Sequence, residues 1–230
     1  MKTGIYWQDP KYALRPGRDF IFDPSLVLYL PLGKLDGASF MSKEARGYLC
    51  TATGALWKPN GRLFDGVDDL ITVPADSSLY SSDYVTFEMW IKPTDAGEGG
   101  FGRLWWKWSG IAGSNAYMNN GTRIQFSLGI DGTSKNVTTA VDSVPFGSWS
   151  HIVMVYDGAN LLGYVNAGTP VSTPATGSID DHSGDDLALG ARAYGANYFY
   201  GLIGEARIYN RALTPLEIQR NYLATKWRYR

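Results

Sequence analysis

Apolar and polar side chains alternate along most of the chain, which is the pattern of half-buried β-strands. Short strands are predicted at 26–30, 63–65, 70–73, 103–108, 123–130, 136–141, 187–190 and 201–209. The clearest run is 85–93, with an apolar face made by Val85, Phe87, Met89 and Ile91. About a dozen such strands, separated by Gly- and Asp-rich turns, predict an all-β fold built as a two-sheet antiparallel sandwich.

Residues 147–168 have the pattern of a β-hairpin near the middle of a sheet. Trp149, His151, Val153 and Val155 fall on one face of its first strand. The other face also carries apolar residues, including Ile152. Residues 157–160 form the turn, and 161–165 run back as the partner strand. Apolar residues on both faces predict an interior position rather than a sheet edge.

One short helix is predicted, close to the C-terminus. Thr214 has the side chain of an N-cap, Pro215 suits the first helical position, and Glu217 completes a capping box. No repeat or low-complexity tract divides the chain. We therefore expect an extended N-terminal arm at 1–25, one sandwich domain at 26–223 and a basic C-terminal tail at 224–230.

Composition narrows the classes of function. The formal net charge is −1, which gives no reason to expect a nucleic-acid partner. Cys50 is the single cysteine, so the chain cannot form an internal disulfide. Residues 1–10 lack the apolar run of a secretion signal, and no later run is long enough to span a membrane.

Four motifs resemble one family. They lie at 64–69 (Phe-Asp-Gly-Val-Asp-Asp), 89–93 (Met-Trp-Ile-Lys-Pro), 149–158 and 201–213 (Gly-Leu-Ile-Gly-Glu-Ala-Arg-Ile-Tyr-Asn-Arg-Ala-Leu). In this order they resemble the laminin G-like, concanavalin A-like lectin/glucanase superfamily over about residues 26–222. The resemblance implies a jelly-roll sandwich with one concave sheet. It also implies a carbohydrate-binding or adhesive module, commonly calcium-dependent, of the kind found in secreted bacterial proteins and phage virions. One departure is Gly204, where many relatives carry Asp.

Catalysis is not expected. Glycosidases need two carboxyl groups across the scissile bond, and the glucanases of this superfamily carry them on one strand as Glu-x-Asp-x-x-Glu. Glu88 stands alone here. A lyase would need a base within a cluster of polar groups, but we interpret His151 as a packed, hydrogen-bonded histidine. His182 is expected to be solvated in a polar loop, and Cys50 to be a small buried residue.

Calcium is the expected cofactor. Asp65, Asp68 and Asp69 in one tight turn can supply several of the oxygen ligands that calcium needs, with Glu205 approaching from the last strand. The alternative is a turn that uses its carboxylates for local hydrogen bonds. A second acidic set is interpreted as a solvated loop rather than a metal site: Asp180, Asp181, Asp185 and Asp186.

Sugar recognition needs aromatic faces for stacking and polar groups for hydroxyls. Alternation places Trp106 and Trp108 opposite Trp105, so at least one of these two sets belongs to the core. The loop 191–200 is rich in tyrosine and long for a sandwich connection, and such loops often carry function. Its predicted ligand-binding residues are Arg192, Tyr194, Asn197, Tyr198 and Tyr200.

Two functions follow from these features. The first is a non-catalytic, lectin-like module that binds a surface glycan, displayed on a phage particle. The second is a structural or decoration protein of a phage virion, which uses the sandwich to assemble with virion subunits or with itself. The aromatic loop and the resemblance favour the first, while the arm and the missing leader favour the second. Both place the chain outside the cell or on the virion surface.

Overall fold

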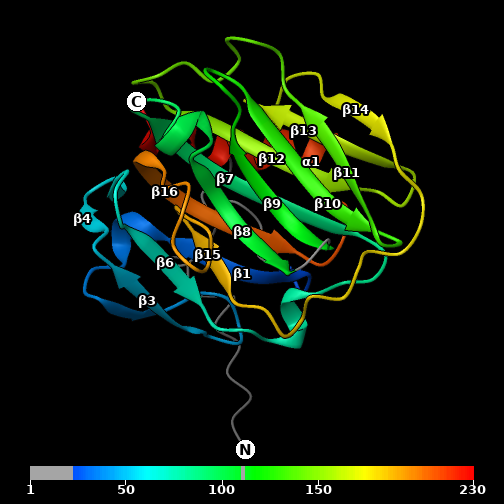
Figure 1. The fold of residues 1–230 in the computed structure, drawn as a ribbon, viewed down its shortest axis with the longest axis horizontal. Coiled ribbons are helices and arrows are strands. Elements are labelled where there is room, and N and C mark those ends of the chain that lie inside the picture. The colour runs from blue at the N-terminus through cyan, green and yellow to red at the C-terminus, as the bar shows by residue number, and fades with distance from the viewer. Residues whose placement is uncertain (1–22, 110–111) are drawn as a thin grey trace, which may run out of the picture.

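Two antiparallel β-sheets packed face to face make up the residues that the computed structural model describes, 23–109 and 112–230 (Figure 1). The predicted all-β, two-sheet jelly-roll sandwich with one short C-terminal helix is confirmed. The covered sheet, named for the helix on its outer face, contains β1 (Leu26–Pro31), β4 (Leu56–Lys58), β5 (Gly61–Asp65), β7 (Val85–Pro93), β12 (Ser150–Tyr156), β13 (Asn160–Val165), β14 (Val171–Pro174) and β16 (Tyr200–Tyr209). The open sheet contains β2 (Ser39–Met41), β3 (Leu49–Thr53), β6 (Leu70–Val73), β8 (Arg103–Ser109), β9 (Ala112–Met118), β10 (Ile124–Ile130), β11 (Thr133–Thr138) and β15 (Leu187–Leu189).

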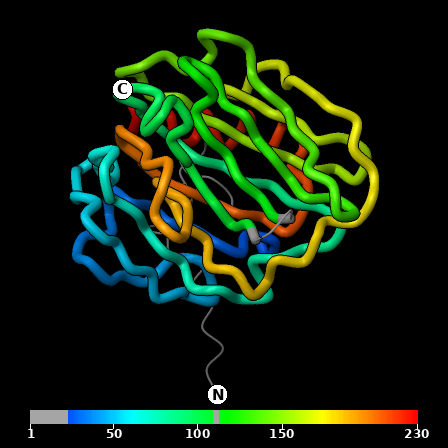
Figure 2. Tube along the Cα trace, viewed as in Figure 1, coloured from blue at the N-terminus to red at the C-terminus, as the bar shows by residue number. Residues whose placement is uncertain are grey.

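The long strand β16 organises the covered sheet. One of its edges pairs with β7, and its other edge pairs first with β5 and then with β1. Figure 2 shows the result, with the blue start of the described chain beside the orange strand β16. The predicted hairpin is confirmed as β12 and β13, and β12 lies between β13 and β7 inside the sheet. All seven residues of β12 are buried, as expected for an interior strand.

The main core lies between the sheets. Phe87 from the covered sheet stacks on Trp105 from the open sheet, with ring centroids 4.9 Å apart and ring planes 8° apart. Trp105 in turn stacks on Phe126, at 5.7 Å between centroids. Val85, Met89 and Ile91 join the same cluster. The apolar face predicted for residues 85–93 is therefore confirmed.

A second, smaller core lies on the outer face of the covered sheet, under α1 (Pro215–Thr225). The predicted capping box is present, since the Thr214 hydroxyl accepts the Glu217 N–H and the Glu217 carboxylate accepts the Thr214 N–H. Ile218 and Ala224 of the helix pack against apolar residues of the sheet such as Val153. Short 3-10 turns complete the fold: η2 (Leu32–Lys34), η3 (Ser77–Leu79), η4 (Glu98–Gly100) and η5 (Lys226–Arg228). In the part of the chain described, none of the helices is both long and apolar enough to cross a membrane.

The two segments predicted outside the sandwich have different outcomes. Most of the arm predicted at 1–25 lies outside the described residues, which begin at 23. The tail predicted at 224–230 packs on the covered sheet. Tyr229 is only 9% exposed, and its ring stacks on Trp90 with centroids 4.6 Å apart. Gly204 lies directly under this ring, where any side chain would overlap the tyrosine. This contact gives a physical reason for glycine at position 204.

We therefore expect Gly204→Ala to lower the free energy of unfolding by about 1–3 kcal/mol, the usual cost of overpacking. Urea denaturation measures the change. In the background of Tyr229→Ala the same substitution should cost much less, because the overlapping ring is gone. An equal cost in both backgrounds would contradict the contact between Gly204 and Tyr229.

Candidate functional site

The turn between β5 and β6 gathers three carboxylates as it crosses from the covered sheet to the open sheet. Oxygen atoms of Asp65, Asp68 and Asp69 all lie within 4.8 Å of one another. Local hydrogen bonds shape the turn, as the alternative interpretation expected: Asp65 Oδ1 accepts the Val67 N–H at 2.8 Å, and Asp69 Oδ2 accepts the Asp65 N–H at 2.8 Å. The turn therefore has both the local bonding and the cluster of oxygens.

Electrostatics make this turn a fitting place for a cation. Asp69 is 4% exposed, whereas Asp65 and Asp68 are exposed. Burial raises the pKa of Asp69, and the negative charges of Asp65 and Asp68 raise it further. Three clustered hard oxygen donors suit calcium, which would relieve the repulsion among the carboxylates.

Glu205 does not join these carboxylates. It lies in the second half of β16, paired with Trp90 and Pro31, whereas the strand meets Asp65 at Tyr200. At about 3.3 Å per residue, the five steps from Tyr200 place Glu205 roughly 16 Å from the turn. Its buried carboxylate accepts hydrogen bonds from Arg207 and from Arg228, the latter at 3.3 Å. Two guanidiniums occupy the oxygens that the calcium hypothesis assigned to metal.

Backbone hydrogen bonds hold the tyrosine-rich loop in place, and they direct the predicted ligand-binding residues to different parts of the surface. The Phe199 N–H bonds to the Gly190 carbonyl at 2.7 Å, and the Arg103 N–H bonds to the Asn197 carbonyl at 2.8 Å. Tyr198 is half-buried on the η4 side, where its N–H donates to Glu98 at 3.1 Å. Tyr200 begins β16 and lies beside the acidic turn. Of the predicted set, Arg192 and Tyr194 line one pocket of the open sheet.

That pocket, here called the tryptophan pocket, has a volume of about 660 Å³ and opens at the outer face of the open sheet. Trp106 and Trp108 form one wall, with ring centroids 6.0 Å apart. The Tyr194 ring meets Trp106 edge-on at 6.2 Å between centroids, and 68% of Tyr194 is exposed. The pocket is lined by Trp106, Trp108, Gly184, Asp185, Asp186, Arg192, Ala193 and Tyr194.

Polar groups complete the tryptophan pocket. The Arg192 guanidinium lies 5.0 Å from the centre of the Trp106 ring and donates to the Tyr194 hydroxyl at 3.1 Å. The loop with the two aspartates is held from behind, because buried Lys107 donates to the Asp185 carbonyl. Asp186 Oδ1 accepts the Ala75 N–H at 2.7 Å. Aromatic faces, a guanidinium and carboxylates thus meet in one preformed hollow.

Sequence reasoning recognised Trp106 and Trp108 as aromatic candidates but did not assign them to the site. The signal was the alternation in β8, which put them opposite Trp105; the structure confirms Trp105 as core and the other two as outward. Asp185 and Asp186 were predicted to lie in a solvated loop. No local pattern joins residues near 106, 185 and 193, because the sheet brings them together across β8 and β15.

The two residues considered for catalysis are both buried. His151 Nε2 lies 2.6 Å from Glu88 Oε1, and neither side chain is more than 1% exposed. Asn221 of α1 donates to the other Glu88 oxygen at 3.0 Å, which closes the pair from outside. Burial opposes ionisation of Glu88, but the Arg207 charge and the His151 hydrogen bond lower its pKa to about 2. The predicted packed His151 is confirmed, and a substrate cannot reach the pair.

His182 and Cys50, the other two residues considered individually, are also buried. The prediction of a solvated His182 is wrong: it is 6% exposed and meets the Tyr80 ring edge-on at 5.8 Å between centroids. Burial against this ring lowers the pKa of His182, and the positive charge of Lys107 lowers it further. Cys50 is fully buried in the main core, as predicted.

A sequence profile described as the concanavalin A-like lectin/glucanases superfamily matches residues 65–219. The match begins at the acidic turn and ends within α1. No curated protein sequence matches the chain.

Solved structures of binding domains share the fold. The receptor-binding domain of botulinum neurotoxin D has 13% identity and a TM-score of 0.65 over 86% of this chain and 52% of that one. The binding domain of Paraclostridial Mosquitocidal Protein 1 has 14% identity and a TM-score of 0.68 over 86% and 52%. This chain spans about half the length of these toxin domains. Domain 4 of AbnA, a GH43 extracellular arabinanase from Geobacillus stearothermophilus solved with arabinotriose, has 19% identity and a TM-score of 0.61 over 87% and 98%.

Proposed function

The chain belongs to the concanavalin A-like lectin/glucanase superfamily, and we propose that it is a non-catalytic module that binds a surface glycan in the tryptophan pocket. The observation that carries this proposal is the convergence of Trp106, Trp108 and Tyr194 with Arg192 in one pocket on the uncovered sheet. Sugars pair apolar C–H faces with hydroxyl groups, so they need both aromatic surfaces and fixed polar partners.

The pocket has properties of a preformed binding site. Its volume of about 660 Å³ lies within the usual range for small-ligand sites. Its walls come from a strand and from a loop tied down by Lys107 and by the Ala75 N–H. A site that is ordered before binding loses little conformational entropy when its ligand arrives.

Two features support a binding role without catalysis. The carboxylate of Glu88 is sealed under α1 with His151. The carboxylates at the tryptophan pocket are neighbours in sequence, and Asp186 is engaged by the Ala75 N–H. Among the related structures, the arabinanase domain was solved with arabinotriose and the toxin domains are named as binding domains. Both features belong to this chain, so the proposal does not depend on the related structures alone.

The second predicted function, a structural or decoration subunit of a phage virion, stays a prediction. It depends on the arm at 1–25, which lies largely outside the described residues. An exposed pair at the sheet edge β4, Leu56 and Trp57, is a further surface on which a virion subunit or a second copy would pack. We place the module outside the cell for either role, in keeping with the extracellular arabinanase that shares its fold.

Glycan binding is tested on a glycan array with single-residue variants. Trp108→Ala and Tyr194→Ala should each weaken binding of the best glycan by roughly tenfold or more, about 1.4 kcal/mol, because each removes a stacking face. Their melting temperatures should stay close to that of the wild type. Tyr200→Ala is the matched control, since this exposed tyrosine belongs to the same loop but lies by the acidic turn. An equal loss in all three variants would contradict the assignment to the tryptophan pocket.

We also propose that calcium binds at Asp65, Asp68 and Asp69 and stabilises the fold. An ion that binds only the native state at 100 times its Kd adds about 2.7 kcal/mol of stability. Calcium should therefore raise the melting temperature of the wild type, and chelation should reverse the rise. Asp68 is exposed, so Asp68→Ala should abolish the rise in melting temperature without disturbing the core. Identical melting curves for both proteins with and without calcium would contradict the proposal that calcium binds at this turn.

A further inference from the structure

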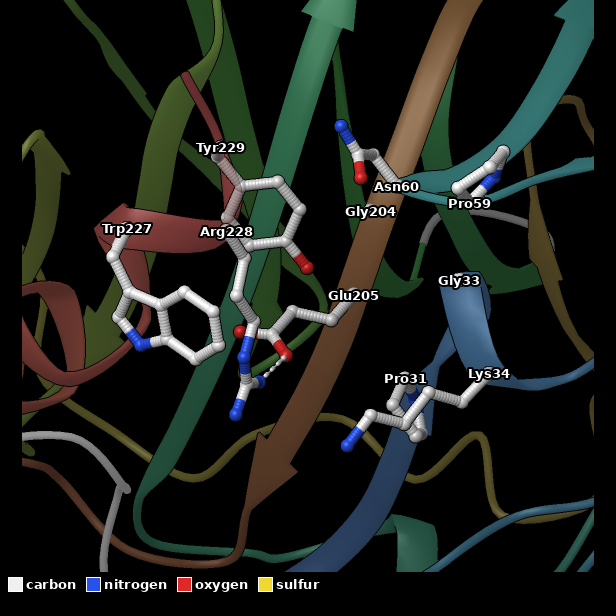
Figure 3. A pocket seen from close by; sticks show the side chains of 10 residues that line it. All are labelled: Pro31, Gly33, Lys34, Pro59, Asn60, Gly204, Glu205, Trp227, Arg228 and Tyr229. Carbon is white, nitrogen blue, oxygen red and sulfur yellow. Dashed lines mark hydrogen bonds and ion pairs between the residues drawn. The ribbon is translucent and has the colours of Figure 1, made fainter. Parts of the chain in front are cut away.

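A second pocket lies on the covered sheet, on the side of the sandwich away from the tryptophan pocket. We propose that it is a separate binding site for a carboxylate-bearing sugar of the hexuronate type. Its volume is about 530 Å³. Segments far apart in the sequence meet there: the end of β1 with η2, the turn between β4 and β5, the middle of β16, and η5. The lining residues are Pro31, Gly33, Lys34, Pro59, Asn60, Gly204, Glu205, Trp227, Arg228 and Tyr229 (Figure 3).

We call this site the Lys34 pocket. Its charged residues favour a negatively charged ligand. Glu205 is its single acidic lining residue, and that carboxylate is shared by Arg207 and Arg228. Arg207 also pairs with Glu88 at 3.1 Å. In this buried group two carboxylates therefore offset two guanidiniums. Lys34, whose side chain is exposed at the rim, leaves the pocket with an excess positive charge.

An aromatic side chain on one side of the pocket favours a ligand whose ring has an apolar face. Trp227 is 50% exposed, and its orientation is set by the hydrogen bond from Nε1 to the Ala224 carbonyl at 2.8 Å. The Arg228 guanidinium lies 5.3 Å from the centre of its ring, so ring and cation border the pocket together. In Figure 3 its indole stands on one side of the pocket, while Lys34 and Asn60 project from the opposite side. Tyr229 forms the third side. It stacks on Trp90 at 4.6 Å between centroids and meets Trp149 at a tilt of 53° and 4.7 Å.

A hexuronate matches this arrangement. Its ring offers C–H groups to the Trp227 indole, its carboxylate an acceptor for the Lys34 ammonium, and its hydroxyls partners for the Asn60 amide. An inorganic anion would use only the cationic side chains, and a neutral hexose only the indole and the amide. The tryptophan pocket differs in its charged groups, because Asp185 and Asp186 lie there beside Arg192 and buried Lys107 donates to the Asp185 carbonyl. The two sites are thus expected to bind different sugars independently.

Isothermal titration calorimetry of the full chain with glucuronate, glucose and acetate tests this proposal. Glucuronate should bind, with glucose and acetate each at least tenfold weaker. Trp227→Ala and Lys34→Gln should each weaken glucuronate binding by roughly tenfold, about 1.4 kcal/mol, with melting temperatures near that of the wild type. Lys58→Gln is the matched control, because this exposed lysine on nearby β4 does not line the pocket.

Four results would overturn the proposal. No heat with glucuronate would mean that no such site exists. Equal affinity for glucose would mean that the carboxylate does not contribute to binding. Equal affinity for acetate would mean that the site binds any carboxylate and does not recognise the sugar ring. If Lys58→Gln and Lys34→Gln weakened glucuronate binding equally, the lysines would act through long-range electrostatics and not through a local contact. Trp108→Ala should leave glucuronate binding unchanged, so failure of the tryptophan pocket and failure of the Lys34 pocket are distinguishable.

Discussion

Replacing Arg207 with alanine is expected to lower the free energy of unfolding by about 3–5 kcal/mol, the typical cost of removing one partner from a buried ion pair. Arg207 is 1% exposed and lies between Glu88 and Glu205, so the variant leaves two buried carboxylates without their shared cation. Each must then be protonated or remain charged in a medium of low polarity. Urea denaturation at neutral pH measures the loss.

The matched control is Arg211→Ala. Arg211 also pairs with two carboxylates, Asp23 at 2.7 Å and Glu217 at 2.8 Å, but its side chain is 35% exposed. Solvent screens such pairs, and each contributes about 0–1 kcal/mol. Similar losses for the Arg207 and Arg211 variants would show that the charges around Glu88 are not sealed from water.

Phe87→Ala is expected to destabilise the fold by a comparable amount, about 3–5 kcal/mol. The ring is 5% exposed and stacks on Trp105, so its removal leaves a cavity at the contact between the two sheets. Thermal or urea denaturation measures the loss, with Val141→Ala as a control because that side chain is 64% exposed. A loss below about 1 kcal/mol for Phe87→Ala would mean that this residue does not fill the inter-sheet core.

Strands and helix were predictable because local rules govern them. Strict alternation in 85–93 fixes which side chains enter the core, and Thr214 with Glu217 fixes where α1 begins. The outer face of the covered sheet was harder to interpret. Glu88 looked isolated in the sequence, yet it is buried with His151 and Arg207 because α1 returns over the sheet from more than 120 residues away.

The binding pocket was only partly predictable, since its residues come from segments with no shared periodicity. Tyr194 and Tyr200 looked equivalent in one loop, but Phe199 between them is fully buried and anchors the loop to Gly190. The two tyrosines consequently lie at different places, one at the tryptophan pocket and one at the acidic turn. Glu205 was assigned to calcium from its motif, whereas the distant Arg228 determines its role as an ion-pair partner.

The central claim, that glycan binds on the open sheet through the tryptophan pocket, is tested most directly by the indole N–H signals of the protein. The chain has 8 tryptophans, and a ¹H–¹⁵N spectrum separates their side-chain signals. During titration with the best glycan from the array, we predict that the signals of Trp106 and Trp108 shift together and saturate. The signals of Trp57, Trp90 and Trp149 should stay in place. Shifts confined to those three, with Trp106 and Trp108 unmoved at saturation, would contradict the claim.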